Sequence, residues 1–276
     1  MDLTWLQSLI LGIVSGVSEF LPVSPEAHLA IVSRVMNIPA VDDLLRMILH
    51  AASLAALVLF CRVELYQLQE ERRIQRSRSR SMKLHSVRQR RILLHQWRGC
   101  LIPGLICWFL LRKYDFVDRM PYLVLILLVN GLILFLPSVL RKGNKDGRNM
   151  SPIDGFAMSI GNGLGFFPGF SRVNGSLSLG VLFGVDQTYA LRLSMLMWIP
   201  ALTLLTVLDG ISAVTGGLAL SVSMLLRYGL TAVAAFLGSS ISLRFLKFLS
   251  VKVGFSGFCF YSWGLALLSF ILYLVV

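Results

Sequence analysis

Charged residues are scarce in this chain, and acidic residues are the scarcest of them. Only 14% of the 276 residues are charged, and 14 Asp and Glu stand against 26 Lys and Arg. Hydrophobic residues make up 56% of the sequence, and its mean hydropathy is +0.74. Soluble domains carry about 25% charged residues. The composition therefore excludes a soluble domain and predicts an all-α integral membrane protein.

Cysteine is also rare, and its spacing excludes two kinds of site. The four cysteines lie in or beside apolar segments and form no CxxC pair: Cys61, Cys100, Cys107 and Cys259. Buried free thiols behave as small hydrophobic side chains. We therefore expect neither a disulfide nor a metal site from them. No basic segment precedes the first apolar run, so we expect no cleavable signal peptide.

The basic residues are concentrated in one stretch. Eleven Lys and Arg lie within 62–98 with only three Glu, which places +8 of the net charge of +12 there. Residues 72–91 contain no aromatic side chain, whereas nucleic-acid grooves combine basic with aromatic residues. We interpret 62–98 as a cytoplasmic loop that sets orientation and contacts anionic lipid headgroups, and we expect no nucleic-acid partner.

Polar residues interrupt the apolar sequence at two places, 12–28 and 161–176. The first contains a proline break between apolar flanks, and the second is broken at Pro168-Gly169. Neither half of either stretch reaches the roughly 20 residues that a membrane span needs. A broken helix at membrane depth must be buried in protein or line a cavity. The sequence therefore predicts two re-entrant helical hairpins, at 3–36 and 151–183.

The remaining apolar runs predict six membrane spans: 44–61, 92–111, 121–140, 189–208, 221–243 and 254–276. With 62–98 in the cytoplasm, the basic loop 141–149 and the basic turn 244–252 fall on the same side, as the positive-inside rule requires. Both termini then lie on the side of the membrane away from the cytoplasm.

The two halves of the chain resemble each other. Pro22 and Pro168 are 146 residues apart, and the Val-Asp pairs at 41–42 and 185–186 are offset by 144. Each half, 1–140 and 141–276, then consists of one hairpin and three spans. We interpret them as inverted-topology repeats whose helix breaks meet near the membrane midplane. The alternative is that Gly and Pro are simply common in membrane helices.

Ionisable residues at a membrane-embedded junction indicate a functional site. We expect this site to contain Glu19, Ser24, Glu26, His28, Ser171, Arg172, Asn174 and Ser176. The guanidinium of Arg172 suits a phosphate oxyanion, and helix N-termini near it add N–H donors. Glu19 can ligate a hard divalent cation, and His28 can act as general acid or base. The set suits phosphoryl chemistry on a membrane-embedded phosphate.

Each of these residues also has a structural interpretation. Glu19 and Arg172 could form an ion pair that only joins the hairpins. We expect His50 to be a packed, hydrogen-bonded core histidine. We expect Arg46 to extend to the membrane surface or to pair with Asp42 or Asp43.

The motifs SEFLPVSPEAH at 18–28 and PGFSR at 168–172 resemble those of the bacterial undecaprenyl pyrophosphate phosphatase family of the bacitracin-resistance type. The resemblance covers almost the whole chain. It implies hydrolysis of undecaprenyl pyrophosphate to the monophosphate on the outer face of the bacterial inner (plasma) membrane, for recycling of the cell-wall lipid carrier, with a divalent cation such as Mg or Ca. In that membrane both termini would lie on the periplasmic or outer side. It also implies that Glu19 is a metal-side carboxylate, that His28 is an acid–base group, and that Arg172 and Ser171 bind phosphate.

The chain departs from this family pattern at the motif positions themselves. The family usually has a second Glu where this chain has Ser15, and its favoured nucleophilic serine is Pro25 here. A Gln expected in the following span is His50, and Val173 to Ser176 replaces Ser-Gly-Ala-Thr. Pro25 cannot attack phosphorus. Either Ser24 or His28 takes that role, or the chain no longer hydrolyses.

Glu26 has two interpretations. It can replace the missing carboxylate as a second metal ligand beside Glu19, or it can stabilise the first turn of the helix that follows Ser24-Pro25. The leading function is a polyprenyl pyrophosphate phosphatase. The alternatives are a polyprenyl-phosphate transporter or flippase, or a catalytically inactive paralogue, on the same scaffold. A homodimer is compatible with the sequence.

Overall fold

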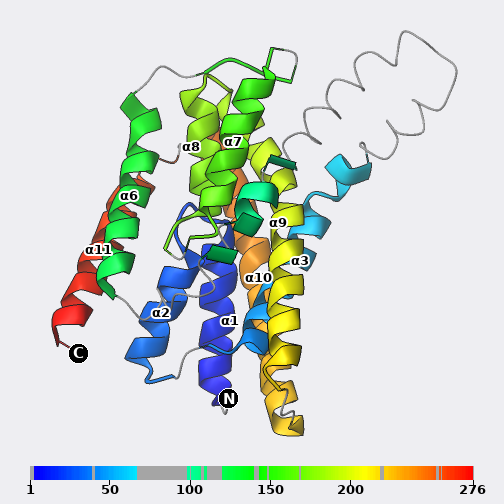
Figure 1. Cartoon of the computed structure of the whole chain (residues 1–276), viewed down its shortest axis with the longest axis vertical. Coiled ribbons are helices and arrows are strands. Elements are labelled where there is room, and N and C mark those ends of the chain that lie inside the picture. The colour runs from blue at the N-terminus through cyan, green and yellow to red at the C-terminus, as the bar shows by residue number, and fades with distance from the viewer. Residues whose placement is uncertain are drawn as a thin grey trace, which may run out of the picture.

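The computed structural model describes residues 3–38, 41–66, 98–99, 101–106, 109–110, 120–139, 143–147, 149–167, 169–217, 221–252, 255 and 257–275. This part of the chain is helical and contains no strand, which confirms the all-α prediction (Figure 1). Half of the predicted span 92–111 and most of the basic loop 62–98 lie outside the described residues. The helices are α1 (Trp5–Phe20), α2 (Pro25–Val35), α3 (Asp43–Phe60), α6 (Met120–Val139), α7 (Pro152–Leu164), α8 (Arg172–Leu182), α9 (Gln187–Thr215), α10 (Val222–Lys252) and α11 (Phe258–Val275).

Long apolar helices identify the chain as a multi-pass membrane protein. Within the described ranges, α3, α9 and α10 are long and apolar enough to cross a bilayer. Helices α1, α6 and α11 carry shorter apolar stretches. Large hydrophobic side chains remain exposed along α6, α10 and α11, as expected where a helix faces lipid rather than water.

Two helices extend beyond their predicted ends. The basic turn predicted at 244–252 is wrong, because α10 continues through these residues to Lys252. The segment contains no Gly or Pro, and its Leu, Arg and Lys residues favour helix. Helix α9 likewise continues past residue 208 and ends at Thr215, where Gly216 and Gly217, the latter with φ +83°, terminate it.

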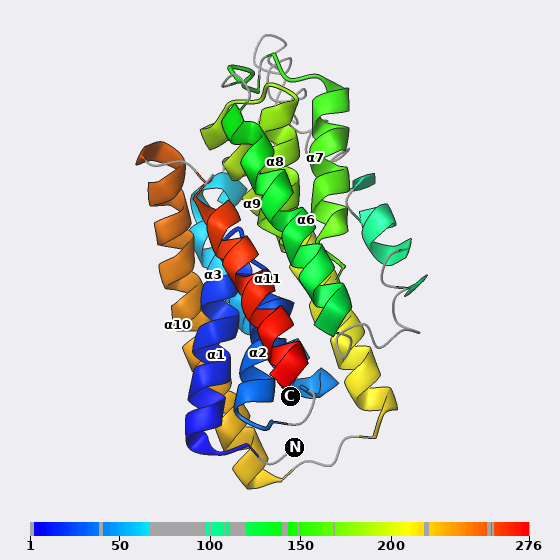
Figure 2. The same ribbon diagram turned by 90° about the vertical axis from the view of Figure 1, so that its left-hand side faces the viewer.

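Two helical hairpins approach each other from opposite ends of the molecule. Figure 1 shows α1 and α2 in one half and α7 and α8 in the other, with their turns meeting near the middle. Figure 2 shows α6 and α11 crossing side by side over this junction. Helix α10 packs along α1, and α9 packs along α3. Phe20 at the end of α1 contacts the Trp198 ring of α9 edge to face, with centroids 5.0 Å apart.

Corresponding helices of the two hairpins begin with the same capping interactions, and both hairpins end just before a residue with positive φ. Ser24 caps α2 by accepting from the amide of Ala27, and Ser171 caps α8 in the same way from Asn174. Helices α1 and α7 each start with a capping box, and α2 and α8 are each followed by a residue with positive φ. Corresponding positions are 147 residues apart: Thr4 and Ser151, Ser24 and Ser171, Asn37 and Gly184.

A close crossing of α1 and α10 holds the first hairpin in place. A Cβ at Gly16 would lie 2.2 Å from the carbonyl oxygen of Ala235, and a Cβ at Gly12 would lie 2.5 Å from that of Thr231. The Gly16 carbonyl also accepts hydrogen bonds from Ser239 and Ser242. Small residues let membrane helices approach closely in this way.

We expect Gly16→Ala to destabilise the protein by about 1–3 kcal/mol, because the new methyl group collides with backbone rather than with a movable side chain. Thermal unfolding in detergent measures the loss. Gly229→Ala on α10 is the matched control, since nothing lies within 4 Å of its added Cβ. Equal melting temperatures for the two variants would contradict the close crossing.

Candidate functional site

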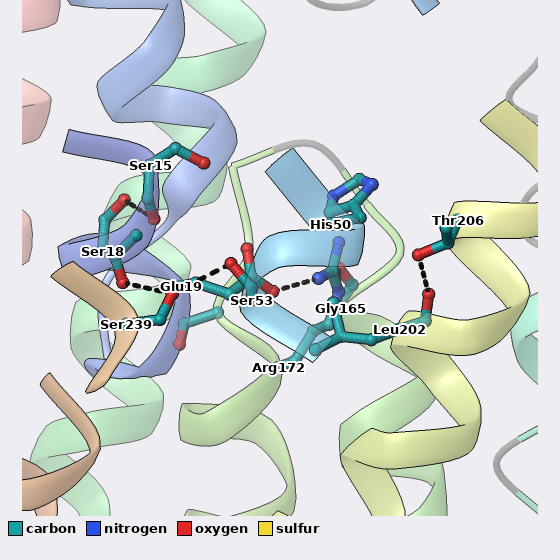
Figure 3. Close-up of polar contacts among 12 residues, drawn as sticks. Ser15, Ser18, Glu19, His50, Ser53, Gly165, Arg172, Leu202, Thr206 and Ser239 are labelled. Atoms are coloured by element: carbon teal, nitrogen blue, oxygen red, sulfur yellow. Dashed lines mark hydrogen bonds and ion pairs between the residues drawn. The ribbon is translucent and has the colours of Figure 1, made fainter. Parts of the chain in front are cut away.

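A buried ion pair joins the tips of the two hairpins. Arg172 Nη1 lies 2.7 Å from Glu19 Oε1, and the two side chains are 6% and 2% exposed (Figure 3). Glu19 is next to the last residue of α1, and Arg172 is the first residue of α8. Residues separated by 153 positions therefore meet because each stands at the end of a helix that stops at a turn.

The Arg172 side chain is held by more than its carboxylate partner. Its Nε donates to the Gly165 carbonyl at 3.1 Å, and its guanidinium lies over the Phe166 ring at 5.8 Å. A Cβ at Gly165 would lie 1.9 Å from Arg172 Cγ, so only glycine fits there. The guanidinium is consequently fixed in position before any ligand arrives.

Further charges surround this pair. Glu19 interacts electrostatically with His50 and Glu26 as well as with Arg172. Glu26 pairs with Arg46, with Oε2 and Nη1 3.4 Å apart, so Arg46 reaches from α3 to the first turn of α2. His50 is buried, as expected, and its Nδ1 lies 2.7 Å from Asp209 Oδ2 of α9.

The predicted polar residues of the second hairpin form a network with α6. The Ser171 amide donates to Asn130 Oδ1, and Asn174 Nδ2 donates to both oxygens of Asn130. The Ser171 hydroxyl donates to the Leu21 carbonyl at 3.3 Å, which links the two turns directly. Ser176 donates to the Arg172 carbonyl one turn before it. Ser171 and Asn174 thus support the turn, and Ser176 bonds within its own helix.

The predicted residues of the first hairpin separate into different groups. Ser24 Oγ accepts from the Ala27 amide. His28 Nδ1 lies 2.6 Å from the Ser24 carbonyl, and its Nε2 lies 2.7 Å from the Tyr261 hydroxyl of α11. The hydrogen bonds of His28 thus involve the backbone of Ser24 and not its hydroxyl. The structure brings Glu19 to Arg172, whereas His28 stacks with Tyr261.

Sequence reasoning missed three residues that belong to these groups: Asn130, Asp209 and Tyr261. Asp209 is a carboxylate inside an apolar helix, which is a signal of function, but the predicted span stopped at residue 208. Asn130 is a lone polar residue in the middle of α6 and gives the same signal. Tyr261 gives none, because tyrosine is common at membrane interfaces.

The described residues contain no group of three or more His, Cys, Asp or Glu side chains that could hold a metal ion. Mg²⁺ in phosphoryl sites is typically held by one or two carboxylates together with substrate phosphates. Glu19 and Glu26, which interact electrostatically, fit a site in which substrate phosphates complete the coordination of the metal ion. They do not fit a metal held by protein side chains alone.

We expect Arg172→Met to destabilise the protein by about 3–5 kcal/mol, because it leaves Glu19 buried without a partner. The double variant Glu19→Leu, Arg172→Met should recover most of that loss, since no unpaired charge remains. Unfolding in detergent measures both. Arg46→Met, which breaks a more exposed pair, is the control and should cost much less. Additive losses in the double variant would show that the two side chains do not interact.

Known proteins resemble this chain along almost its whole length. The family model described as bacitracin resistance protein BacA matches residues 8–268. An undecaprenyl-diphosphatase of Bifidobacterium longum is 28% identical and covers 99% of this chain and 95% of its own. One from Thermosipho africanus is 28% identical over 96% of this chain and 99% of its own, and one from Methanobrevibacter smithii is 24% identical over 96% of each. The chain belongs to the BacA family.

Proposed function

We propose that the protein hydrolyses a polyprenyl pyrophosphate to the monophosphate and inorganic phosphate, for recycling of the cell-wall lipid carrier. The observation that carries the proposal is the buried Arg172 at the junction of the hairpins. Relatives that cover almost the whole chain are named undecaprenyl-diphosphatases. The arginine supports binding of a phosphate, and the names of the relatives favour hydrolysis over a transporter, a flippase or an inactive paralogue.

In this proposal, Arg172 binds the terminal phosphate. Its side chain is already oriented by Gly165 and Phe166, so little conformational entropy is lost on binding. Helix α8 begins at the same residue, and its N-terminal amides and dipole favour an anion there. Ser171 and Asn174 support this turn through Asn130. Ser176 lies one turn further along α8 and completes the predicted phosphate-binding set.

Binding of a phosphate at Arg172 changes the environment of Glu19. The anion competes with Glu19 for the guanidinium, so the carboxylate loses part of its charge compensation in a buried place. Glu19 is the residue that would hold a divalent cation there, and such a cation would supply the missing charge compensation. Glu26 is the second candidate ligand, and its interaction with Arg46 holds it near α3. A bound cation would supply charge neutralisation for the phosphates.

Ser24 and His28 are the candidate nucleophile and acid–base group of the first hairpin. A serine hydroxyl needs a base within hydrogen-bonding reach before it can attack. In the described structure the Ser24 hydroxyl accepts from a backbone amide, and His28 bonds to the Ser24 carbonyl and to Tyr261. Attack by Ser24 therefore requires the α1–α2 turn to rearrange. Pro25, as the first residue of α2, stabilises that turn.

We also propose that the chain consists of two inverted-topology repeats. The equal 147-residue spacing of corresponding caps supports this proposal, as does the approach of the hairpins from opposite ends (Figure 1). In the proposed orientation, the end that carries both termini faces the periplasm or exterior, and the basic loops face the cytoplasm. A homodimer remains compatible with this arrangement.

We expect the purified protein to release phosphate from a C55 pyrophosphate, and chelation of divalent cations to abolish the release. Arg172→Lys should lower kcat/KM by about 100-fold, because lysine lacks the planar fork that holds a phosphate. Arg227→Lys is the control, since Arg227 donates to the Leu3 carbonyl far from the hairpin tips. Retained lipid binding without phosphate release would favour the transporter or the inactive paralogue.

The orientation has a direct test in intact cells. Single cysteines replace Asn144, in the exposed loop before α7, and Ser223, at the start of α10, in a chain without its native cysteines. We expect an impermeant thiol reagent to label position 223 from outside, and position 144 only after the inner membrane is opened. Labelling of both positions from one side would contradict the proposed topology.

A further inference from the structure

A second buried pair of ionisable side chains lies beside the hairpin junction, and none of the roles described above uses it. Nδ1 of His50 in α3 lies 2.7 Å from Oδ2 of Asp209 in α9, within hydrogen-bonding distance. The two side chains are 10% and 15% exposed. Both belong to helices that are apolar enough to cross a membrane. Charged residues in such helices are costly and are usually retained for function.

The His50 side chain lies beside the proposed phosphate site. His50 lies near the Arg172 guanidinium and the Glu19 carboxylate in Figure 3, and it interacts electrostatically with both Glu19 and Glu26. The groups around it are thus Asp209 from α9, Glu19 from α1, Glu26 from α2 and Arg172 from α8. Among the described residues, no hydrogen-bond partner engages Nε2 of His50.

The Asp209 carboxylate determines which ring nitrogen carries the proton. An ionised carboxylate only accepts hydrogen bonds, so it selects the imidazole form with the proton on Nδ1. Nε2 then bears the lone pair and points away from Asp209. A neutral imidazole held in one form by a carboxylate is the arrangement of a general base.

We propose that His50 is the general base for direct attack of water on the terminal phosphorus, and that Asp209 is its positioning residue. This inference rests on the proposed hydrolysis. As the water oxygen bonds to phosphorus, one water proton moves to Nε2 of His50. The bond from phosphorus to the bridging oxygen breaks, and its electron pair leaves on the polyprenyl monophosphate. The imidazolium later returns its proton to solvent or product.

This route explains how the chain dispenses with a serine at Pro25. A covalent intermediate needs a nucleophilic side chain, whereas water needs only a base and a phosphate held in place. The family pattern predicts a glutamine where this chain has His50. The chain therefore lacks the serine nucleophile at position 25 and has a candidate base at position 50. A general-base histidine needs a partner that orients its ring, and Asp209 is that partner. A glutamine at position 50 would not need one.

The test compares steady-state phosphate release from a C55 pyrophosphate by full-length variants. His50→Gln can still donate to Asp209 and should remain folded, yet it should lower kcat by about 100-fold with little change in KM. His50→Ala should lose as much and should recover at least 10-fold with added imidazole. Asp209→Asn should lower kcat about 10-fold. Ser53→Ala, one turn along α3 and bonded to Ser239, is the control and should stay within twofold of the parent chain.

The outcomes separate this inference from the proposed function. No phosphate release by the parent chain refutes the proposed hydrolysis itself. An active parent with His50→Gln at or above parental kcat refutes the role of His50, since the glutamine then suffices. Failure of imidazole to restore His50→Ala also refutes it, because a purely structural histidine gives that result. Loss in His50→Gln together with rescue by imidazole supports the general base.

Discussion

The ion pair between Glu19 and Arg172 is the interaction on which the rest of the structure depends. It joins two hairpins that approach each other from opposite ends of the molecule. The pair is buried, and an unpaired charge in a buried position is very costly. The surrounding contacts serve to keep both partners in place. Gly165 has no side chain and so leaves room for the Arg172 side chain. The Ser171 hydroxyl donates to the Leu21 carbonyl and links the two turns, and Asn130 connects the second turn to α6. Breaking a buried pair of this kind is costly unless another group compensates the charge that is left.

The site gathers its charges from helices that are distant in the sequence. Glu26 and Arg46 connect α2 with α3, and His50 and Asp209 connect α3 with α9. Helix α3 is therefore common to both outer pairs, and its packing between α9 and α10 decides where their charges lie. This arrangement separates two tasks. The hairpins carry the residues proposed to bind phosphate, and the long helices behind them carry the charges that surround those residues.

The sequence was sufficient to predict the helical membrane class and the positions of both helix breaks, because Pro, Gly and the capping serines act locally. It also placed Glu19 and Arg172 in one site and offered their ion pair as the structural alternative, because a charged group at membrane depth needs a partner. It did not predict Asp209 as the partner of His50 or Tyr261 as the partner of His28, because those contacts depend on how α9 and α11 rotate against their neighbours. The end of α10 was missed for a related reason. Basic residues mark the membrane edge, but a helix without Gly or Pro continues past it.

The lengths of the hairpin arms have a consequence for how this protein can change. Helix α1 has 16 residues and α7 has 13, which gives arms of about 24 Å and 20 Å at 1.5 Å per residue. The length of each arm determines how far its tip lies from the start of the helix. One inserted residue would advance a tip by about 1.5 Å and turn it by about 100°, so Glu19 would point away from Arg172. Lipid-facing side chains can therefore vary freely, whereas the two arms can change length only together with their packing partners.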